Sequence, residues 1–216
     1  MLFRSQGGPS AGRGRAPSRI VSLSPTPRHA ADHLCPPWIG RFLAFNPLRR
    51  LLYAPESLLA DLVAEGMTVL EPGPGMGFFT LDLARLVGPT GRVVAVDVQP
   101  KMLETLRRRA VRARLSDRLD LRVAYGSTMG VNDLAGRVGF ALAFAMVHEV
   151  PDAGRFFGEI SAALSPGGRL LFSEPSWHVA EEFFQRELDA ALAAGLDVEG
   201  RPRIPISRSV LLRKKT

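Results

Sequence analysis

Two hydrophobic patterns alternate along the chain from residue 54 onward. Short apolar runs of strand length are separated by longer segments in which apolar side chains recur every three or four positions. The short runs lie at residues 68–71, 91–98, 119–124, 140–146 and 169–173. Strands that alternate with amphipathic helices are typical of a parallel sheet covered by helices. We therefore predict an α/β fold.

The segments between these runs carry the helical spacing. Helices are expected over residues 55–65, 78–87, 99–115, 152–164 and 179–194. Asp152 is expected to cap the fourth helix, which the SPGG turn at residues 165–168 should end. The last stretch, DVEGRPRIPISRSVLLRKK, contains two strands joined by a turn. The sheet is therefore expected to end in an antiparallel hairpin.

Composition narrows the class of protein. A chain of 216 residues, 46% of them hydrophobic, is long enough to bury the core of one domain. Its apolar runs all fall short of the roughly 20 residues that a membrane-spanning helix needs. Cys35 is the single cysteine, so the sequence offers no intramolecular disulfide and no cysteine-based metal cage. These features predict a cytoplasmic protein without a metal site.

The positive charge is concentrated at the N-terminus. Residues 1–30 hold five of the 28 basic side chains and no acidic ones, which leaves 23 basic against 21 acidic side chains elsewhere. This stretch is rich in Gly, Pro, Ser and Arg and lacks hydrophobic periodicity, so a disordered basic tail is expected. Residues 31–53, which include His33 and Cys35 in DHLCPPW, are expected to form a lid or cap over a domain at residues 54–216.

A glycine-rich loop directly follows the first predicted strand, in VLEPGPGMGFFT at residues 69–80. Glycines at such a turn let a ligand approach the backbone, and the following helix offers free N–H groups. The dinucleotide fingerprint would need a glycine at position 78, where the chain has Phe78. Glu71 would also repel a pyrophosphate, whereas it would attract the ammonium group of S-adenosylmethionine. The loop therefore favours S-adenosylmethionine over a nicotinamide dinucleotide.

Four segments in order resemble motifs of the class I S-adenosylmethionine-dependent methyltransferases, and more narrowly the small-molecule branch that includes quinone-biosynthesis enzymes. They are EPGPGMG, AVDVQPKML, AMVHEVPD and LSPGGRLLFSEP, and the resemblance covers about residues 54–214. It implies a Rossmann-like, doubly wound, mostly parallel seven-stranded sheet with an antiparallel C-terminal hairpin strand. It also implies an enzyme that transfers a methyl group from S-adenosylmethionine.

The resemblance assigns roles to single residues. Glu71 would bind the methionine ammonium group, and Asp97 would accept hydrogen bonds from both ribose hydroxyls. Val98 and Met102 would sandwich the adenine, although Met102 also fits the core and Asp97 also fits a helix cap. The remaining positions implied for cofactor binding are Gly73, Pro74, Gly75, Gly77, Gly126, Ser127 and Ala145.

Methyl transfer from a sulfonium is an in-line displacement, so a base is needed only if the acceptor must lose a proton. His148 with Glu149, and His178 shortly after Glu174, lie at the carboxyl ends of predicted strands, where ligands of open α/β sheets bind. We expect these four residues to be catalytic. The alternative is that Glu174 and His148 only tie loops together.

The acceptor is expected to be a small molecule of unspecified identity. An RNA-modifying enzyme that uses the basic tail and the arginine-rich helix at residues 99–115 is one alternative, but a solvated helix face explains those charges better. A non-catalytic S-adenosylmethionine-binding protein is another. The sequence leaves the oligomeric state open.

Overall fold

The computed structural model describes residues 47–125 and 127–215. The predicted basic tail, most of the predicted cap with His33 and Cys35, and the candidate Gly126 lie outside the described residues.

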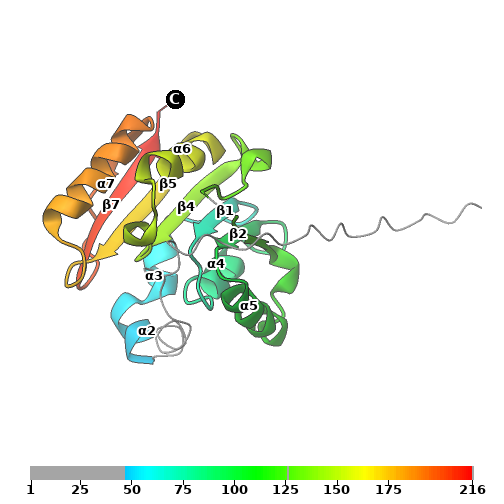
Figure 1. The fold of residues 1–216 in the computed structure, drawn as a ribbon. Coiled ribbons are helices and arrows are strands. Elements are labelled where there is room, and N and C mark those ends of the chain that lie inside the picture. The colour runs from blue at the N-terminus through cyan, green and yellow to red at the C-terminus, as the bar shows by residue number, and fades with distance from the viewer. Residues whose placement is uncertain (1–46, 126, 216) are drawn as a thin grey trace, which may run out of the picture.

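Seven strands form one sheet in the order β3-β2-β1-β4-β5-β7-β6 (Figure 1). All neighbouring pairs from β3 to β5 are parallel, whereas β7 pairs antiparallel with both β5 and β6. The strands are β1 Thr68–Pro72, β2 Arg92–Asp97, β3 Leu119–Val123, β4 Val138–Phe144, β5 Leu164–Pro175, β6 Leu196–Gly200 and β7 Ser207–Lys214. The predicted doubly wound sheet with its antiparallel hairpin strand is confirmed.

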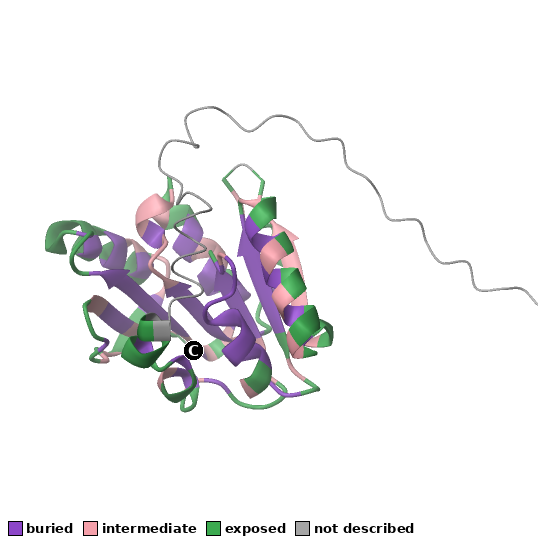
Figure 2. Ribbon diagram, turned by 90° about the horizontal axis from the view of Figure 1, so that it is seen from below, coloured by how far each residue is buried: buried purple, intermediate pink, exposed green. Residues whose placement is uncertain are grey.

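Helices cover both faces of the sheet. They are α2 Pro47–Tyr53, α3 Pro55–Leu59, α4 Thr80–Leu86, α5 Pro100–Ala113, α6 Ala153–Ala163 and α7 Glu181–Ala193. Neighbouring strand residues point to opposite faces, so Leu70 packs with α6 and α7 while Val69 packs with α3, α4 and α5. Figure 2 shows the resulting buried strands between helices that are exposed on their outer sides.

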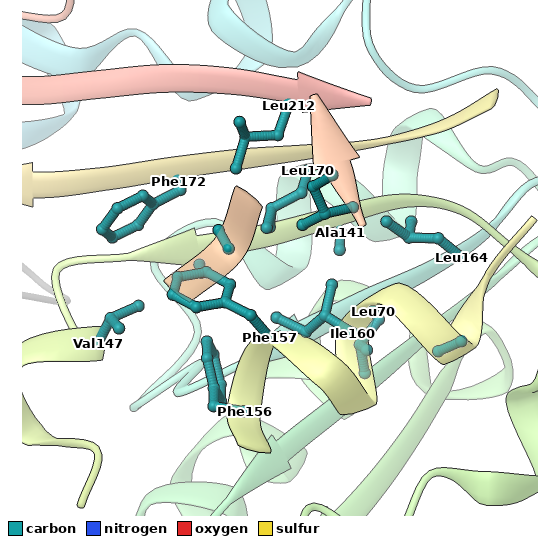
Figure 3. Packing of buried hydrophobic residues seen from close by; sticks show 14 of the residues in the cluster. Leu70, Ala141, Val147, Phe156, Phe157, Ile160, Leu164, Leu170, Phe172 and Leu212 are labelled. Carbon is teal, nitrogen blue, oxygen red and sulfur yellow. The ribbon is translucent and has the colours of Figure 1, made fainter. Parts of the chain in front are cut away.

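The core beneath α6 and α7 is built on aromatic contacts. Phe157 of α6 meets Phe172 of β5 edge to face, and Phe172 stacks on Phe184 of α7. Leu70 and Ile160 fill the same layer (Figure 3). Because strands buried on both faces carry apolar side chains at successive positions, they read as continuous apolar runs in the sequence.

Two expected boundaries are wrong. The SPGG segment does not form a free turn, because β5 begins at Leu164, directly where α6 ends, and Leu164 already pairs with Val138. A register shift absorbs the extra residues before pairing resumes between Phe140 and Arg169. The first expected helix is also shorter, since α3 ends at Leu59. The expected cap of α6 is confirmed, since Asp152 Oδ1 accepts a hydrogen bond from Arg155 N.

Within residues 47–125 and 127–215, no helix is both long and apolar enough to cross a bilayer. No group of three or more His, Cys, Asp or Glu side chains in these ranges is arranged to hold a metal ion.

Candidate functional site

A cavity of about 250 Å³ opens at the carboxyl ends of β1, β2 and β4. Its walls come from the glycine loop, the turn from β2 to α5, Ser127–Met129 and the segment that follows β4. Parallel strands bring these loops together although they are far apart in the chain. Of the described candidates for cofactor binding, only Gly77 is not part of the wall.

The three loop glycines serve different purposes. All three have positive φ, but a Cβ on Gly75 would meet nothing within 4 Å, so this position leaves room for a ligand. A Cβ on Gly73 would lie 2.9 Å from Met146 Cγ, and one on Gly77 would lie 2.4 Å from Leu106 Cδ1. Gly77 therefore allows the loop to pack against α5, whereas Gly75 faces the cavity.

Arg109 of α5 holds this loop from behind. Its guanidinium donates to the carbonyl oxygens of Met76 and of Gly77, the latter at 2.9 Å. The sequence predicts a solvated basic face for the helix that carries Arg109. No sequence pattern identifies this contact, because it joins residues that are 32 and 33 positions apart in the sequence and meet only in the fold.

Glu71 places a carboxyl group on the wall of the cavity. Its side chain is only 3% exposed, and Oε2 has no hydrogen-bond partner among the described residues. Burial raises its pKa to about 8; the charges of Asp97 and Asp82 act in the same direction, while the nearby Thr80 hydroxyl opposes them. Because Thr80 Oγ1 is itself unpartnered there, we infer that Thr80 does not satisfy this carboxyl. An ammonium group in the cavity would supply the missing partner.

Asp97 connects the two loops at the end of β2. Its Oδ2 accepts a hydrogen bond from Gly75 N at 3.1 Å, and its Oδ1 accepts one from Gln99 N at 2.8 Å. Burial raises its pKa, and these backbone hydrogen bonds oppose the rise. Each oxygen keeps a second lone pair, so Asp97 can fasten the loops and still accept from a ligand hydroxyl.

Apolar side chains also line the cavity. Val98 lines it with 47% of its surface exposed, and Met102 lines it while packing against Met76. Met102 is therefore both core and cavity wall. Ser127 contributes there too, although its hydroxyl already accepts a hydrogen bond from Arg155 at 2.8 Å. The lining residues that were not predicted include some that adjoin the motifs, namely Met76, Phe78, Phe79 and Gln99, and others that do not, such as Thr128 and Met129.

A second polar group lies at the ends of β4 and β5. Glu174 is fully buried, and its Oε1 accepts from Val147 N at 2.7 Å and from His148 N at 3.3 Å. Its Oε2 lies 2.6 Å from His148 Nδ1. A carboxylate there makes Nδ1 the protonated nitrogen and leaves the lone pair on Nε2. Glu174 thus ties the loop down and also orients the imidazole.

The candidate catalytic residues are brought together, but only one reaches the cavity. The ring of His178 lies 5.0 Å from that of His148, edge to face, and His148 Nε2 lies 4.0 Å from Glu149 Oε1. Glu149 lines the cavity, whereas His148, Glu174 and His178 do not. Glu149 is therefore the candidate on the cavity wall, and its Oε1 lies 4.0 Å from the imidazole of His148.

Charges around His148 favour its protonated form. Burial alone would lower the pKa of His148, but the hydrogen bond and charge of Glu174, together with Glu149 and Glu187, raise it. Glu187 of α7 was not predicted: it is 4% exposed, Oε2 has no partner within the described ranges, and burial raises its pKa to about 8. Its position on the same helical face as Phe184, Leu188 and Ala191 is the signal that could have identified it.

The comparisons with known proteins agree with this geometry. Residues 64–198 match a family model described as a methyltransferase domain. The chain belongs to the methyltransferases. The predicted S-adenosylmethionine-dependent, class I family is confirmed, with relatives from the quinone-biosynthesis branch, and S-adenosylmethionine is the cofactor of the domain.

Two curated relatives illustrate the match. The chain is 32% identical over 117 residues to a ubiquinone/menaquinone biosynthesis C-methyltransferase of Hahella chejuensis, which covers 53% of this chain and 46% of that protein. It is 32% identical over 123 residues to a protein-L-isoaspartate O-methyltransferase of Methanothrix thermoacetophila, covering 56% and 54%. The chain thus spans about half the length of these curated relatives.

A crystal structure of a SAM-dependent methyltransferase from Aquifex aeolicus superposes with a TM-score of 0.73 at 22% identity, covering 83% of this methyltransferase and 99% of that chain. At this identity the likeness shows the shared fold. The residues present fit the cofactor, since Glu71 Oε2, which has no hydrogen-bond partner in the described part of the chain, could accept from its ammonium group, and Gly75 leaves space for a ligand.

We expect Glu71→Gln to stabilise the ligand-free methyltransferase at high pH and to weaken its binding of S-adenosylhomocysteine. The folded-state pKa of about 8 exceeds the ordinary value of 4.5, so the wild type loses stability as pH rises between these values. The glutamine variant has no such loss. Its melting temperature should match that of the wild type near pH 4.5 and exceed it increasingly up to pH 8.

Thermal unfolding across this pH range and calorimetry measure the two effects. Glu56→Gln, at an exposed position outside the cavity wall, is the matched control and should change neither. Parallel pH curves for Glu71→Gln and the wild type would contradict the assignment.

For Asp97→Ala we expect a loss of S-adenosylhomocysteine affinity of roughly 10- to 100-fold, because hydrogen bonds to a charged group are worth about 1.5–3 kcal/mol. The variant should also lose the preference of the wild type for adenosine over 2′,3′-dideoxyadenosine, measured by competition. If that preference survives, Asp97 only fastens the two loops.

Proposed function

We propose that this methyltransferase transfers a methyl group from S-adenosylmethionine to a small-molecule acceptor, with His148 as the base. The hydrogen bond between His148 Nδ1 and the buried Glu174 supports the proposal most strongly, because it directs a basic Nε2 toward Glu149 on the cavity wall. A histidine oriented in this way can take a proton near neutral pH.

The separate roles of the cofactor and of the chain follow from the chemistry of methyl transfer. S-adenosylmethionine supplies a methyl group on a positively charged sulfur, already activated for displacement. The chain has to hold an acceptor in line with that bond, exclude water and receive a proton. Glu71, Asp97 and the glycine loop hold the cofactor, while Glu174 and His178 position the imidazole of His148.

A cap over the acceptor is part of the proposal. Arg50 of α2 makes a two-pronged ion pair with the buried Asp82 of α4, and Tyr53 packs edge to face on Phe78 and Phe144. Phe78 and Phe144 line the cavity. These contacts support a capping role for residues 47–53, the described part of the predicted cap at residues 31–53, on the predicted domain at residues 54–216.

A small acceptor fits better than a nucleic acid. The relative from Hahella chejuensis methylates carbon in quinone biosynthesis, according to its name. In the arginine-rich α5, Arg109 donates hydrogen bonds to the glycine loop and Arg108 donates one to Glu104. These two side chains therefore make contacts within the domain. The relative from Methanothrix thermoacetophila acts on a protein, according to its name. A label-transfer assay distinguishes a protein acceptor from a small-molecule acceptor.

We expect His148→Ala to lower turnover by about 10²- to 10⁴-fold, the range for loss of a general base, and to leave S-adenosylhomocysteine affinity unchanged. The assay is transfer of a labelled methyl group to a low-molecular-mass filtrate of a cell extract. In the wild type, turnover should rise with pH through the raised pKa of His148.

Glu174→Gln removes the charge that raises the pKa of His148, so the rise should move to lower pH while the maximum rate falls. A structural role for Glu174 would not move the pH profile. Full turnover by His148→Ala would exclude His148 as the base, and label transferred only to protein or RNA would contradict a small acceptor.

A further inference from the structure

The strands β4, β1, β2 and β3 lie side by side in the sheet, and the segments that follow them line the cavity. Glu71 belongs to β1 and Asp97 to the end of β2. The loop after β3 carries Ser127 and Thr128, which also line the cavity. Ala124 N, at the start of that loop, donates to Asp97 O at 3.0 Å, so the loop directly borders the end of β2.

A cofactor held by Glu71 and Asp97 would follow the sheet from β1 to β2. Its ammonium group would lie at Glu71, and its ribose hydroxyls would lie at Asp97, about one strand spacing of 4.8 Å further along. The adenine, which is attached to the ribose, would then reach the loop after β3. His148 follows β4, on the opposite side of β1.

The hydroxyl group of Ser127 makes one hydrogen bond of fixed direction. Arg155 Nη1 of α6 lies 2.8 Å from Ser127 Oγ. Because a guanidinium group has no acceptor, Arg155 donates and Ser127 accepts. The proton of the hydroxyl group is then left to be donated elsewhere, and no described residue accepts it.

The hydroxyl group of Thr128 is in the same state. Its Oγ1 accepts from Gly130 N at 3.1 Å, and a backbone N–H cannot accept in return. Nor does this hydroxyl group donate to a partner within residues 47–125 and 127–215. A loop on the cavity wall therefore carries two hydroxyl donors that are still available to a ligand.

The loop is held in place from α6. Glu159 Oε2 accepts from Met129 N at 2.8 Å, and Glu159 Oε1 lies 3.4 Å from Arg155 Nε. Tyr125 and Thr128 also form an isolated antiparallel bridge. Because these contacts fix the loop before a ligand binds, little ordering of the donors is needed on binding.

Adenine offers its ring nitrogens N1, N3 and N7 as hydrogen-bond acceptors. We infer that Ser127 and Thr128 donate hydrogen bonds to ring nitrogens of the cofactor adenine, so that the loop selects the base by its acceptor atoms. A carboxylate at this position would instead accept from the exocyclic amino group. The inference goes beyond the proposed function, because it depends neither on His148 nor on the class of methyl acceptor.

The test measures, by calorimetry, the binding of S-adenosylhomocysteine and of its 1-deaza, 3-deaza and 7-deaza analogues. Each analogue replaces one ring nitrogen by C–H. We expect the wild type to bind at least one analogue roughly two- to tenfold more weakly, the range for one neutral hydrogen bond. Ser127→Ala or Thr128→Val should bind S-adenosylhomocysteine more weakly by a similar factor and should no longer discriminate against that analogue.

Two control variants keep the result interpretable. Ser127→Thr retains a hydroxyl group and should retain the discrimination. Ser116→Ala, at an exposed position outside the cavity wall, is the matched control and should bind all four compounds as the wild type does. The melting temperature of each variant shows that it is folded.

Equal affinity of the wild type for all four compounds overturns the inference without any variant. Discrimination that is as strong in Ser127→Ala and in Thr128→Val as in the wild type also overturns it. Absence of S-adenosylhomocysteine binding by the folded wild type overturns it together with the roles of Glu71 and Asp97. A protein that selects for a ring nitrogen through these hydroxyl groups but transfers no methyl group supports the inference and contradicts only the proposed function.

Discussion

The burial of the Glu71 carboxyl group is the constraint on which the site depends. A carboxyl group removed from water costs free energy unless a charge or hydrogen bonds compensate for it. Here the end of β1 places the group beside two further acidic residues, Asp97 and Asp82, which make ionisation still less favourable. A positively charged ligand would remove that cost, so in the role proposed for Glu71 the cost of its burial would contribute to affinity for the cofactor.

The surrounding structure keeps this carboxyl group in place. Asp97 joins the loop after β1 to the turn after β2, and Arg109 holds the same loop from α5. Arg50 and Arg85 compensate the charge of Asp82 on the other side. At the ends of β4 and β5, Glu174 also joins two segments through one buried carboxylate. It accepts a hydrogen bond from Val147 N and lies against His148 Nδ1, so it fixes the loop and orients the imidazole.

Most of the fold could be predicted from the sequence because it follows from periodicity. Strands such as β2 are buried on both faces, and the spacing of Leu103, Leu106 and Ala110 marks the inner face of α5. The glycine loop and Asp97 can be identified in the sequence as candidate cofactor-binding positions because they adjoin the ends of predicted strands. The SPGG segment was misjudged because its extended course depends on pairing with β4, which local sequence does not encode.

Contacts between distant segments could not be predicted. The positions of His148 and Glu174 at strand ends suggest a shared site, but not which atoms meet or that Glu149, and not His148, lines the cavity. Arg109 has the pattern of an ordinary helix charge, since the carbonyl oxygens that it binds are brought to it only by the packing of α5. The spacing of α7 places Glu187 on the buried face, but its nearness to Glu174 and His148 follows only from the packing of that helix.

The most direct test of the account is the number of protons released when S-adenosylhomocysteine binds at pH 7. Calorimetry in buffers of different ionisation enthalpy gives this number. Because the pKa of Glu71 is about 8 in the ligand-free protein, the group is mostly protonated at this pH and must ionise to hold the ammonium group. About one proton should be released by the wild type, and close to none by Glu71→Gln. If the two proteins release the same number, the Glu71 carboxyl group is not the receptor for the cofactor, and the account fails at its central point.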